Sequence, residues 1–116
     1  TDVYVDPALV RYAQRLAAAT RNLNGVRLDE LASYVEYGVS PRGPINLALS
    51  ARALALLRGR RYVVPHDLRE LTKDVFRHRI VLSYQALAEE VAADTILDAV
   101  LQAVPAPRIE LRREVA

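Results

Sequence analysis

Apolar and polar positions follow a helical period over most of this chain, beginning with residues 6–22. One side of that segment is apolar and the other is polar, as in an amphipathic helix. The apolar side is formed by Leu9, Ala13, Leu16 and Ala17. Asp6 followed by Pro7 is typical of an N-cap and a first helical position. The pattern therefore predicts a helix over residues 6–22 that buries one face.

The most apolar stretch, residues 41–57, predicts a second helix. Beyond its first turn the interruptions are Asn46, Ser50 and Arg52. A helix that is apolar on nearly all sides belongs in the middle of a bundle, so we expect Leu54 to be buried. Ser40 is expected to be the N-cap, with Pro41 at the first helical position and Gly59 just beyond the end.

Two more helices are predicted, over residues 65–79 and 86–104. Pro65 opens the first with Asp67 in its first turn, and Pro105 ends the second. Their inward positions are Leu68, Leu71, Thr72 and Val75 in the first helix, and Val91, Ile96, Val100 and Val104 in the second. The polar residues between these positions are expected to face water.

The remaining segments are short. Residues 62–64 and 80–82 are mostly β-branched, so they are predicted to be extended and to pair with each other. Residues 22–38 contain the turn signal Asn24-Gly25 and then an irregular apolar spacing, so they are predicted to be mostly loop. The sequence as a whole predicts an all-α fold, a small bundle of about four helices with a short extended pair.

Composition narrows the class of protein. With 116 residues the chain fits one domain, and with one Phe and no Trp its core must be built from Ala, Leu, Val and Ile. The absence of Cys excludes disulfides and thiolate metal sites. No apolar run of about 18 residues and no basic-then-apolar leader occur, so no membrane span is predicted and a cytoplasmic location is expected.

The chain begins with Thr1 and contains no Met, so we expect it to be part of a longer protein. The predicted organisation is a linker from an upstream domain over residues 1–5, a helical domain over residues 6–107 and a charged tail over residues 108–116.

The usual signatures of a complete active site are missing from the sequence. It has no phosphate-binding loop, no His-Glu-x-x-His, no Gly-x-Ser-x-Gly and no glycine-rich dinucleotide fingerprint. The two histidines, His66 and His78, have no paired spacing, so no metal site is predicted. Carboxylates are scattered singly, which does not indicate a paired acid and base.

Arg42 is the residue whose position lacks a structural explanation. It lies in the first turn of the predicted apolar helix, where a cation meets the positive end of the helix dipole at a cost of up to about 1 kcal/mol. A bound anion would remove that conflict, because helix N-termini bind phosphate and arginine offers it a planar fork of donors. Gly43 would let such a ligand approach the backbone closely. The alternative is a solvated surface arginine.

Four short sequence blocks follow one another along the chain: Gly38-Val39-Ser40-Pro41-Arg42, Gly59-Arg60, Tyr62-Val63-Val64-Pro65-His66-Asp67 and His78-Arg79. In these blocks the chain resembles the C-terminal lid domain of MoxR-type AAA+ ATPases. The helix that includes Thr20-Arg21 and the one that ends at Val104-Pro105-Ala106-Pro107 resemble the lid as well, so the resemblance spans nearly the whole chain. Val39 and Gly43 depart from it, since Ala is common at both positions.

The resemblance implies a role for the arginine. Arg42 would be the sensor 2 residue, the catalytic group that reaches from the lid to the γ-phosphate of ATP held by an upstream core domain. Pro41 and Ile45 would line the base or ribose. His78-Arg79 would either contact a neighbouring subunit or simply close its helix.

The resemblance also implies what surrounds the chain. ATP and Mg²⁺ would be bound by the intact protein, and this fragment alone would bind neither. The intact protein would be a homo-oligomeric, hexameric ring with a chaperone-like role in the maturation of client proteins or in the insertion of their metal cofactors. The sequence does not reveal which clients these are.

Two other functions stay open. A pI near 9.2 and a net charge of +2 are compatible with a helical DNA-binding domain. The arginines of this chain that would contact DNA, however, fall on more than one helix and are interleaved with Glu70 and Asp74, so no nucleic-acid partner is predicted. They are the arginines at 52, 58, 60, 61, 69 and 77. A plain protein-interaction module would differ from the lid only in making Arg42 incidental.

Overall fold

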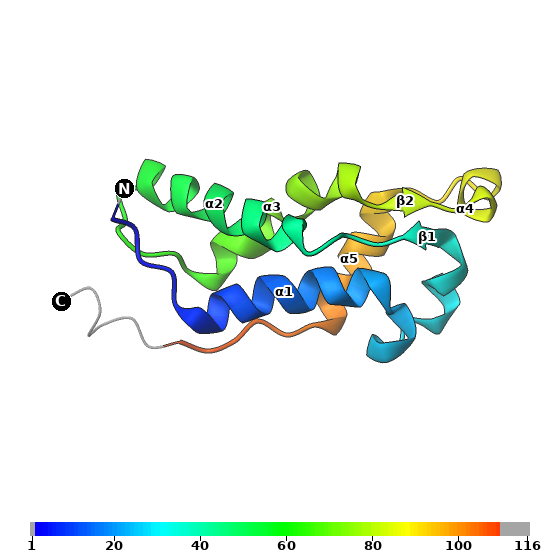
Figure 1. Ribbon diagram of the computed structural model, residues 1–116, viewed down its shortest axis with the longest axis horizontal. Coiled ribbons are helices and arrows are strands. Elements are labelled where there is room, and N and C mark those ends of the chain that lie inside the picture. Colours follow the sequence, from blue (N-terminus) through cyan, green and yellow to red (C-terminus); the bar gives the residue numbers. More distant parts are fainter. Residues whose placement is uncertain (1, 110–116) are drawn as a thin grey trace.

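The computed structural model describes residues 2–109 and is elongated, with extents of 51 × 23 × 19 Å (Figure 1). Over that range its helices are α1 (Pro7–Arg21), α2 (Arg42–Leu57), α3 (Pro65–Phe76), α4 (Tyr84–Ala88) and α5 (Ala93–Ala103). An antiparallel pair is formed by β1 (Val35–Tyr37) and β2 (Val81–Leu82), and 3₁₀ turns cover Leu23–Val26, Asp29–Tyr34 and Arg77–Arg79. The predicted all-α class with a short extended pair is confirmed.

The core lies between α1, α2, α3 and α5. α1 packs against both α2 and α5, and α3 packs against the same two helices. The predicted inward face of α1 is confirmed, because Leu9, Ala13, Leu16 and Ala17 are all buried. Its predicted cap is confirmed as well, since Asp6 accepts a hydrogen bond from the Ala8 N–H at 2.8 Å. Phe76, the one phenylalanine, is fully buried.

α3 keeps its predicted face but ends earlier than predicted. Leu68 and Thr72 are buried, while Leu71 and Val75 are half-buried. The regular helix stops at Phe76, and the chain tightens into the 3₁₀ turn Arg77–Arg79 before β2.

The prediction that α2 occupies the middle of the bundle is wrong. Its buried face is a narrow strip at every fourth residue, Gly43, Leu47, Ala51 and Ala55, with Pro44 buried beside the first of them. The opposite face is open, with Ile45 61% exposed and Leu57 85% exposed, and Leu54 is only half-buried. Apolar composition does not reveal how many sides of a helix have neighbours, and among the elements of residues 2–109 only α1 and α3 cover α2 extensively.

The predicted pairing of the extended segments is also wrong. β2 pairs with β1, matching Val35 to Leu82 and Tyr37 to Val81. Tyr62 instead forms an isolated parallel bridge with Tyr4, with the Tyr4 N–H donating to the Arg61 carbonyl at 2.8 Å. Residues 22–38 thus contain a strand and two 3₁₀ turns where mostly loop was predicted.

The last predicted helix is two helices. α4 begins at Tyr84 with Ser83 as its cap, and α5 begins at Ala93. Between them Glu90 adopts a left-handed conformation with φ of 60°. The Val91 N–H donates to the Ala86 carbonyl and the Glu90 N–H to the Leu87 carbonyl, which together close a Schellman motif that ends α4.

After α5 the chain runs back along α1 (Figure 1), and Ala106 and Ile109 pack against the core. Most of the predicted charged tail, residues 110–116, lies outside the described residues. The predicted domain boundaries stay a prediction. Among residues 2–109, no helix has the length and apolar content that a membrane crossing requires.

Candidate functional site

Arg42 is the first residue of α2, and the chain reaches it through a short linker from β1. Pro41 already has helical dihedrals, and the helix begins one residue later than predicted. Ser40 therefore lies one residue before the assigned cap, although its hydroxyl still accepts a hydrogen bond from the Arg42 N–H at 3.3 Å. The Ser40 carbonyl accepts from the Gly43 N–H at 3.0 Å.

The end of α1 holds this linker in place. The buried Thr20 hydroxyl accepts a hydrogen bond from the Val39 N–H at 2.8 Å and donates to the Ala17 carbonyl at 2.6 Å. The Arg21 guanidinium donates to the Val39 carbonyl. A Cβ at Gly38 would lie 2.6 Å from the Thr20 carbonyl oxygen, so only glycine permits this approach. The start of α2 is thereby fixed to α1.

The pattern of apolar and polar residues does not indicate that Thr20 and Arg21 position the linker before α2. The two residues appear in the sequence as the polar end of an amphipathic helix, and the hydrogen bonds to Val39 bridge 18 and 19 residues of chain. The available signal was the resemblance itself, which includes Thr20-Arg21 without assigning it a task.

The Arg42 side chain is exposed, and within residues 2–109 its guanidinium takes part in no hydrogen bond or ion pair. The first turn of α2 contains no acidic residue that could offset the charge. The positive end of the helix dipole and the guanidinium therefore face the solvent together, and an anion placed there would interact favourably with both.

Pro41 and Ile45 lie beside Arg42 and are exposed, one helical turn apart. They add an apolar edge to the cationic helix start. Gly43 does not join them, because it is buried and a Cβ there would overlap Val39 Cγ1 and come within 3.3 Å of Phe76 Cε1. The expectation that Gly43 lets a ligand approach is therefore wrong: this glycine lets α2 pack against the core.

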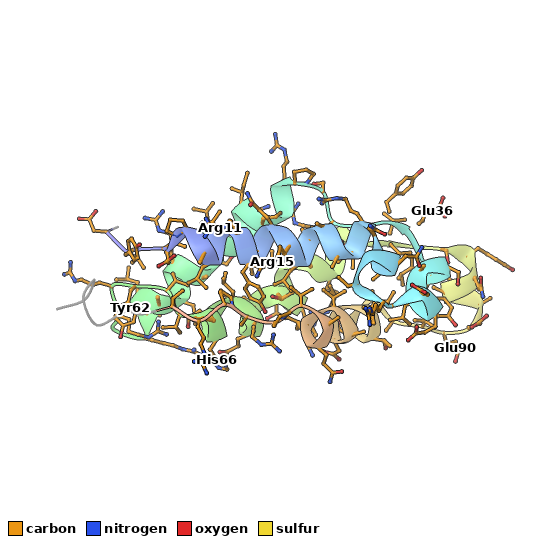
Figure 2. All side chains as sticks on the ribbon, turned by 90° about the horizontal axis from the view of Figure 1, so that it is seen from below. Arg11, Arg15, Glu36, Tyr62, His66 and Glu90 are labelled. Atoms are coloured by element: carbon orange, nitrogen blue, oxygen red, sulfur yellow. The ribbon has the colours of Figure 1, made fainter. Side chains whose placement is uncertain are left out.

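A hollow of about 500 Å³ adjoins the same helix start. It is lined by Arg11, Gln14, Arg15, Ala18, Arg21, Pro41 and Pro44. Figure 2 places Arg11 and Arg15 in succession along α1, and the sequence of α1 contains no acidic residue. Like charges four residues apart destabilise a helix slightly, so this face of α1 also favours an anionic neighbour.

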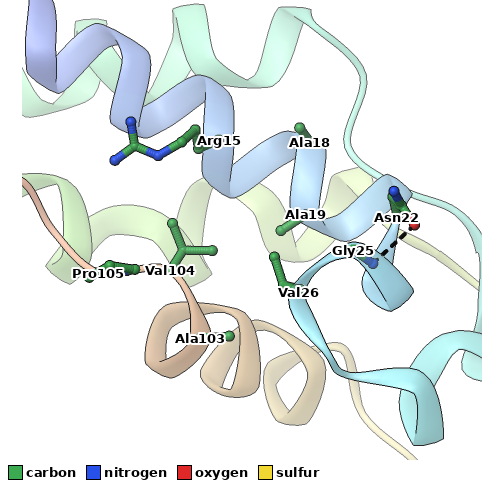
Figure 3. A pocket seen from close by; sticks show the side chains of 9 residues that line it. All are labelled: Arg15, Ala18, Ala19, Asn22, Gly25, Val26, Ala103, Val104 and Pro105. Atoms are coloured by element: carbon green, nitrogen blue, oxygen red, sulfur yellow. Dashed lines mark hydrogen bonds between the residues drawn. The ribbon is translucent and has the colours of Figure 1, made fainter.

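A second hollow, of about 390 Å³, lies between the ends of α1 and α5 (Figure 3). Its lining is mainly alanine and valine, and Asn22 accepts a hydrogen bond there from the Gly25 N–H at 3.2 Å. Arg15 is the charged side chain in its lining, and Arg42 is not part of it. This hollow therefore does not extend the site around Arg42.

The histidines lie apart from this site. His66 is exposed on α3, with its Nε2 3.3 Å from a Glu70 carboxylate oxygen, and His78 is exposed in the 3₁₀ turn beside Arg79. In the part of the chain that the structure describes, no group of three or more His, Asp or Glu side chains could hold a metal ion.

Comparisons with known proteins identify the family that this chain matches. A family model described as the AAA lid domain matches residues 30–110. The chain is 42% identical over 106 residues to "Chaperone MoxR1" of Mycobacterium tuberculosis, which covers 91% of this chain and 28% of that protein. It is 38% identical over 110 residues to "Protein MoxR" of Paracoccus denitrificans, covering 90% of this chain and 32% of that protein.

A solved structure is similar as well. The crystal structure of a protein described as a "putative ATPase" from Cytophaga hutchinsonii superposes with a TM-score of 0.89 at 36% identity, over 92% of this chain and 32% of that one. The chain therefore spans about a third of the length of the relatives it matches.

Proposed function

This chain belongs to the AAA lid domain family and is a lid of the MoxR type, and on this premise we propose that it supplies the sensor 2 arginine, Arg42, to an ATP-hydrolysing protein. The observation that carries the proposal is an exposed arginine, without a partner in residues 2–109, at a helix start fixed by buried hydrogen bonds. The structural cost of that cation is explained if an anion binds there.

The chemistry follows from the charge. In phosphoryl transfer, negative charge develops on the γ-phosphate oxygens and on the leaving group, and a preorganised guanidinium stabilises it. Because Thr20 and Arg21 fix the linker before α2, the backbone of Arg42 is held in one place relative to the rest of the lid. Pro41 and Ile45 are proposed to contact the base or ribose through their exposed apolar surfaces.

We assign the remaining catalytic groups to a part of the intact protein that corresponds to the unmatched length of the relatives. The phosphate-binding loop, the carboxylates that hold Mg²⁺ and the catalytic base would belong to an ATPase core there. ATP and Mg²⁺ would be bound by the intact protein, and the isolated lid would bind ATP weakly or not at all, because one arginine cannot replace a phosphate-binding loop.

The open face of α2 gives this core a surface to contact. Ile45, Leu49 and Leu56 are more than half exposed along the helix that begins at Arg42. We assign this face to contact with the core, so that closure on ATP moves the lid as a rigid body and couples hydrolysis to movement within a ring of subunits. The chaperone-like maturation role rests on the name of one relative, "Chaperone MoxR1".

Photolabelling of the intact protein with 8-azido-ATP tests where the nucleotide lies. Trypsin cleaves after Arg27, Arg42 and Arg52, so Pro41 and Ile45 fall in the peptides Leu28–Arg42 and Gly43–Arg52. We expect label in one or both, protected by excess unlabelled ATP. The peptide Ile80–Arg108, which contains α4 and α5, is the internal control. The placement of the nucleotide beside Pro41 and Ile45 would be contradicted if only that control peptide were labelled, or if no lid peptide were labelled.

A further inference from the structure

The end of the molecule formed by β1, β2 and α4 carries exposed apolar side chains that the proposed nucleotide site does not use. Tyr37 and Val81 are partners across the two strands, and Tyr84 and Leu87 lie one turn apart on α4. All four are more than half exposed, with Tyr84 at 84%. We name these four residues the tip patch. Figure 1 places β1, β2 and α4 together at the end away from the N-terminus.

The same end is acidic. The two segments that build it, residues 28–37 and 80–92, contain no Lys or Arg although the chain as a whole has a net charge of +2, and the exposed Arg27 and Arg79 directly precede them. Their carboxylates are Asp29, Glu30, Glu36, Glu89 and Glu90. Figure 2 places Glu36 and Glu90 at one end, away from Arg11 and Arg15 on α1. Around the tip patch the five carboxylates therefore outnumber the two flanking arginines.

This end is held in a defined shape. The Ser83 hydroxyl donates to the Ser33 carbonyl at 2.6 Å, and the Ser83 N–H donates to the Tyr34 carbonyl at 2.9 Å. The Tyr34 hydroxyl donates to a Glu89 carboxylate oxygen at 2.6 Å, and this hydrogen bond lowers the pKa of Glu89. The tip patch is thus preorganised, which reduces the entropy lost on binding.

Glu90 adds a second sign that this end has a task besides folding. It occupies the left-handed position of the Schellman motif, where glycine is usual because a side chain at positive φ is strained. Arg27 is the other non-glycine residue with a positive φ among the described residues. Strain of this kind is found where a side chain is needed for a contact.

We propose that the tip patch and its carboxylates form a docking surface for a cationic segment, bearing apolar side chains, of another protein. The aromatic and aliphatic side chains would supply buried area, and the carboxylates would select Lys or Arg and speed association. The residues that carry this proposal lie on other elements than Arg42, although Tyr37 and Pro41 line one hollow of about 570 Å³. Tyr84, Leu87 and Glu90 are not part of that lining, so variants at these positions test the docking surface separately from the nucleotide site.

The test uses a defined probe on this 116-residue chain. A short peptide of lysine and leucine is titrated into the ¹⁵N-labelled chain, with a lysine and serine peptide of equal charge and a glutamate and leucine peptide as controls. We expect amide shifts confined to residues 33–37 and 81–91 for the lysine and leucine peptide, weaker shifts for the lysine and serine peptide, and none for the acidic one. Raising NaCl from roughly 50 to 300 mM should weaken binding, since it shortens the screening length.

Paired variants separate docking from general charge attraction. Tyr84→Ser/Leu87→Ser should bind the lysine and leucine peptide at least about fivefold more weakly, the loss expected for an interface contact worth roughly 1 kcal/mol. Glu36→Gln/Glu90→Gln should weaken binding to a similar degree. The control Val10→Ser, which removes an exposed apolar side chain from α1, should leave binding unchanged. Thermal unfolding checks that each variant is folded.

Three results would overturn the proposal. One is that no shifts occur at the tip patch, or that the larger shifts map to α2. Another is that the lysine and serine peptide binds as tightly as the lysine and leucine peptide. The third is a concentration-dependent dimer in sedimentation that Tyr84→Ser/Leu87→Ser abolishes, which would assign the tip patch to a second copy of this chain.

Discussion

The starts of α2 and α3 share a proline in or just before the first turn but treat the helix dipole in opposite ways. At α3, Asp67 sits in the first turn, fully buried, and accepts a hydrogen bond from the Val64 N–H at 2.9 Å. At α2 the first turn has no acid and instead begins with the exposed Arg42. One helix start has its charge paired within the chain, and the other has an exposed charge that residues 2–109 leave unpaired.

The α3 start also neutralises its carboxylate internally. Arg60 forms two hydrogen bonds to Asp67, at 2.7 and 2.8 Å, and Arg58 lies 3.6 Å away. Burial alone would raise the pKa of Asp67, but the hydrogen bonds from Arg60 and Val64 and the charges of Arg60 and Arg58 lower it. This comparison indicates that charge at a helix start serves the fold where it is buried and paired, and is available for binding where it is exposed and unpaired.

Removing the partner of Asp67 should have the largest effect on stability. Arg60→Ala leaves a buried carboxylate without its two hydrogen bonds, so we expect a loss of roughly 3 kcal/mol in the free energy of unfolding, toward the low end for buried pairs because Arg58 remains nearby. Urea unfolding measures it. The exposed neighbour Arg61 is the control, and Arg61→Ala should change stability by less than about 0.5 kcal/mol. Equal effects at both positions would mean that Asp67 is not stabilised by Arg60.

Acid should weaken the same helix start. Because the pKa of Asp67 is lower in the folded chain than in the unfolded chain, its contribution is complete above about pH 3.9, the unfolded value, and is lost as pH falls from there through the folded value. One carboxylate changes the free energy of unfolding by at most about 1.4 kcal/mol per pH unit. The slope of stability against pH in this window should be shallower for Asp67→Asn. Parallel slopes for the two proteins would contradict the assignment.

Reversing the charge at the α2 start should have the smallest effect, and in the opposite direction. Arg42→Glu places an anion at the positive end of the dipole, so we expect the isolated chain to gain about 0.3 to 1 kcal/mol at low salt and less in about 1 M NaCl. Arg42→Gln, the neutral control, should fall between the two. A loss of stability in Arg42→Glu would mean that Arg42 has a structural task within the lid.

The predicted and observed folds agree where a local pattern decides the outcome. The periodicity of α1 and its Asp6-Pro7 start were sufficient for its bounds and buried face. The side of α2 that is covered was not predictable, because an apolar helix gives the same pattern with two neighbours as with four. The break between α4 and α5 was not predicted, because the left-handed position that ends α4 is occupied by Glu90. A glycine there would have indicated the end of a helix.

The candidate site was also predictable only in part from the sequence. The placement of Arg42 in the first turn of an apolar helix came from the sequence, and the structure adds that its side chain is exposed. Gly43 was misassigned because its neighbours, Val39 and Phe76, come together only through tertiary packing. The hydrogen bonds from Thr20 and Arg21 to Val39 depend on where α1 ends relative to the linker, which no local pattern encodes.

The central claim, that Arg42 acts on the phosphate and not on the fold, is tested most directly by ATP turnover of the intact protein at saturating ATP. We expect Arg42→Ala to lower turnover by about tenfold or more, since losing one preorganised donor to developing charge costs on the order of 3 kcal/mol, with a smaller effect on ATP affinity. Arg61→Ala should turn over at the parental rate. If Arg42→Ala also hydrolyses ATP at the parental rate, Arg42 is not the sensor 2 residue and the account of this site fails.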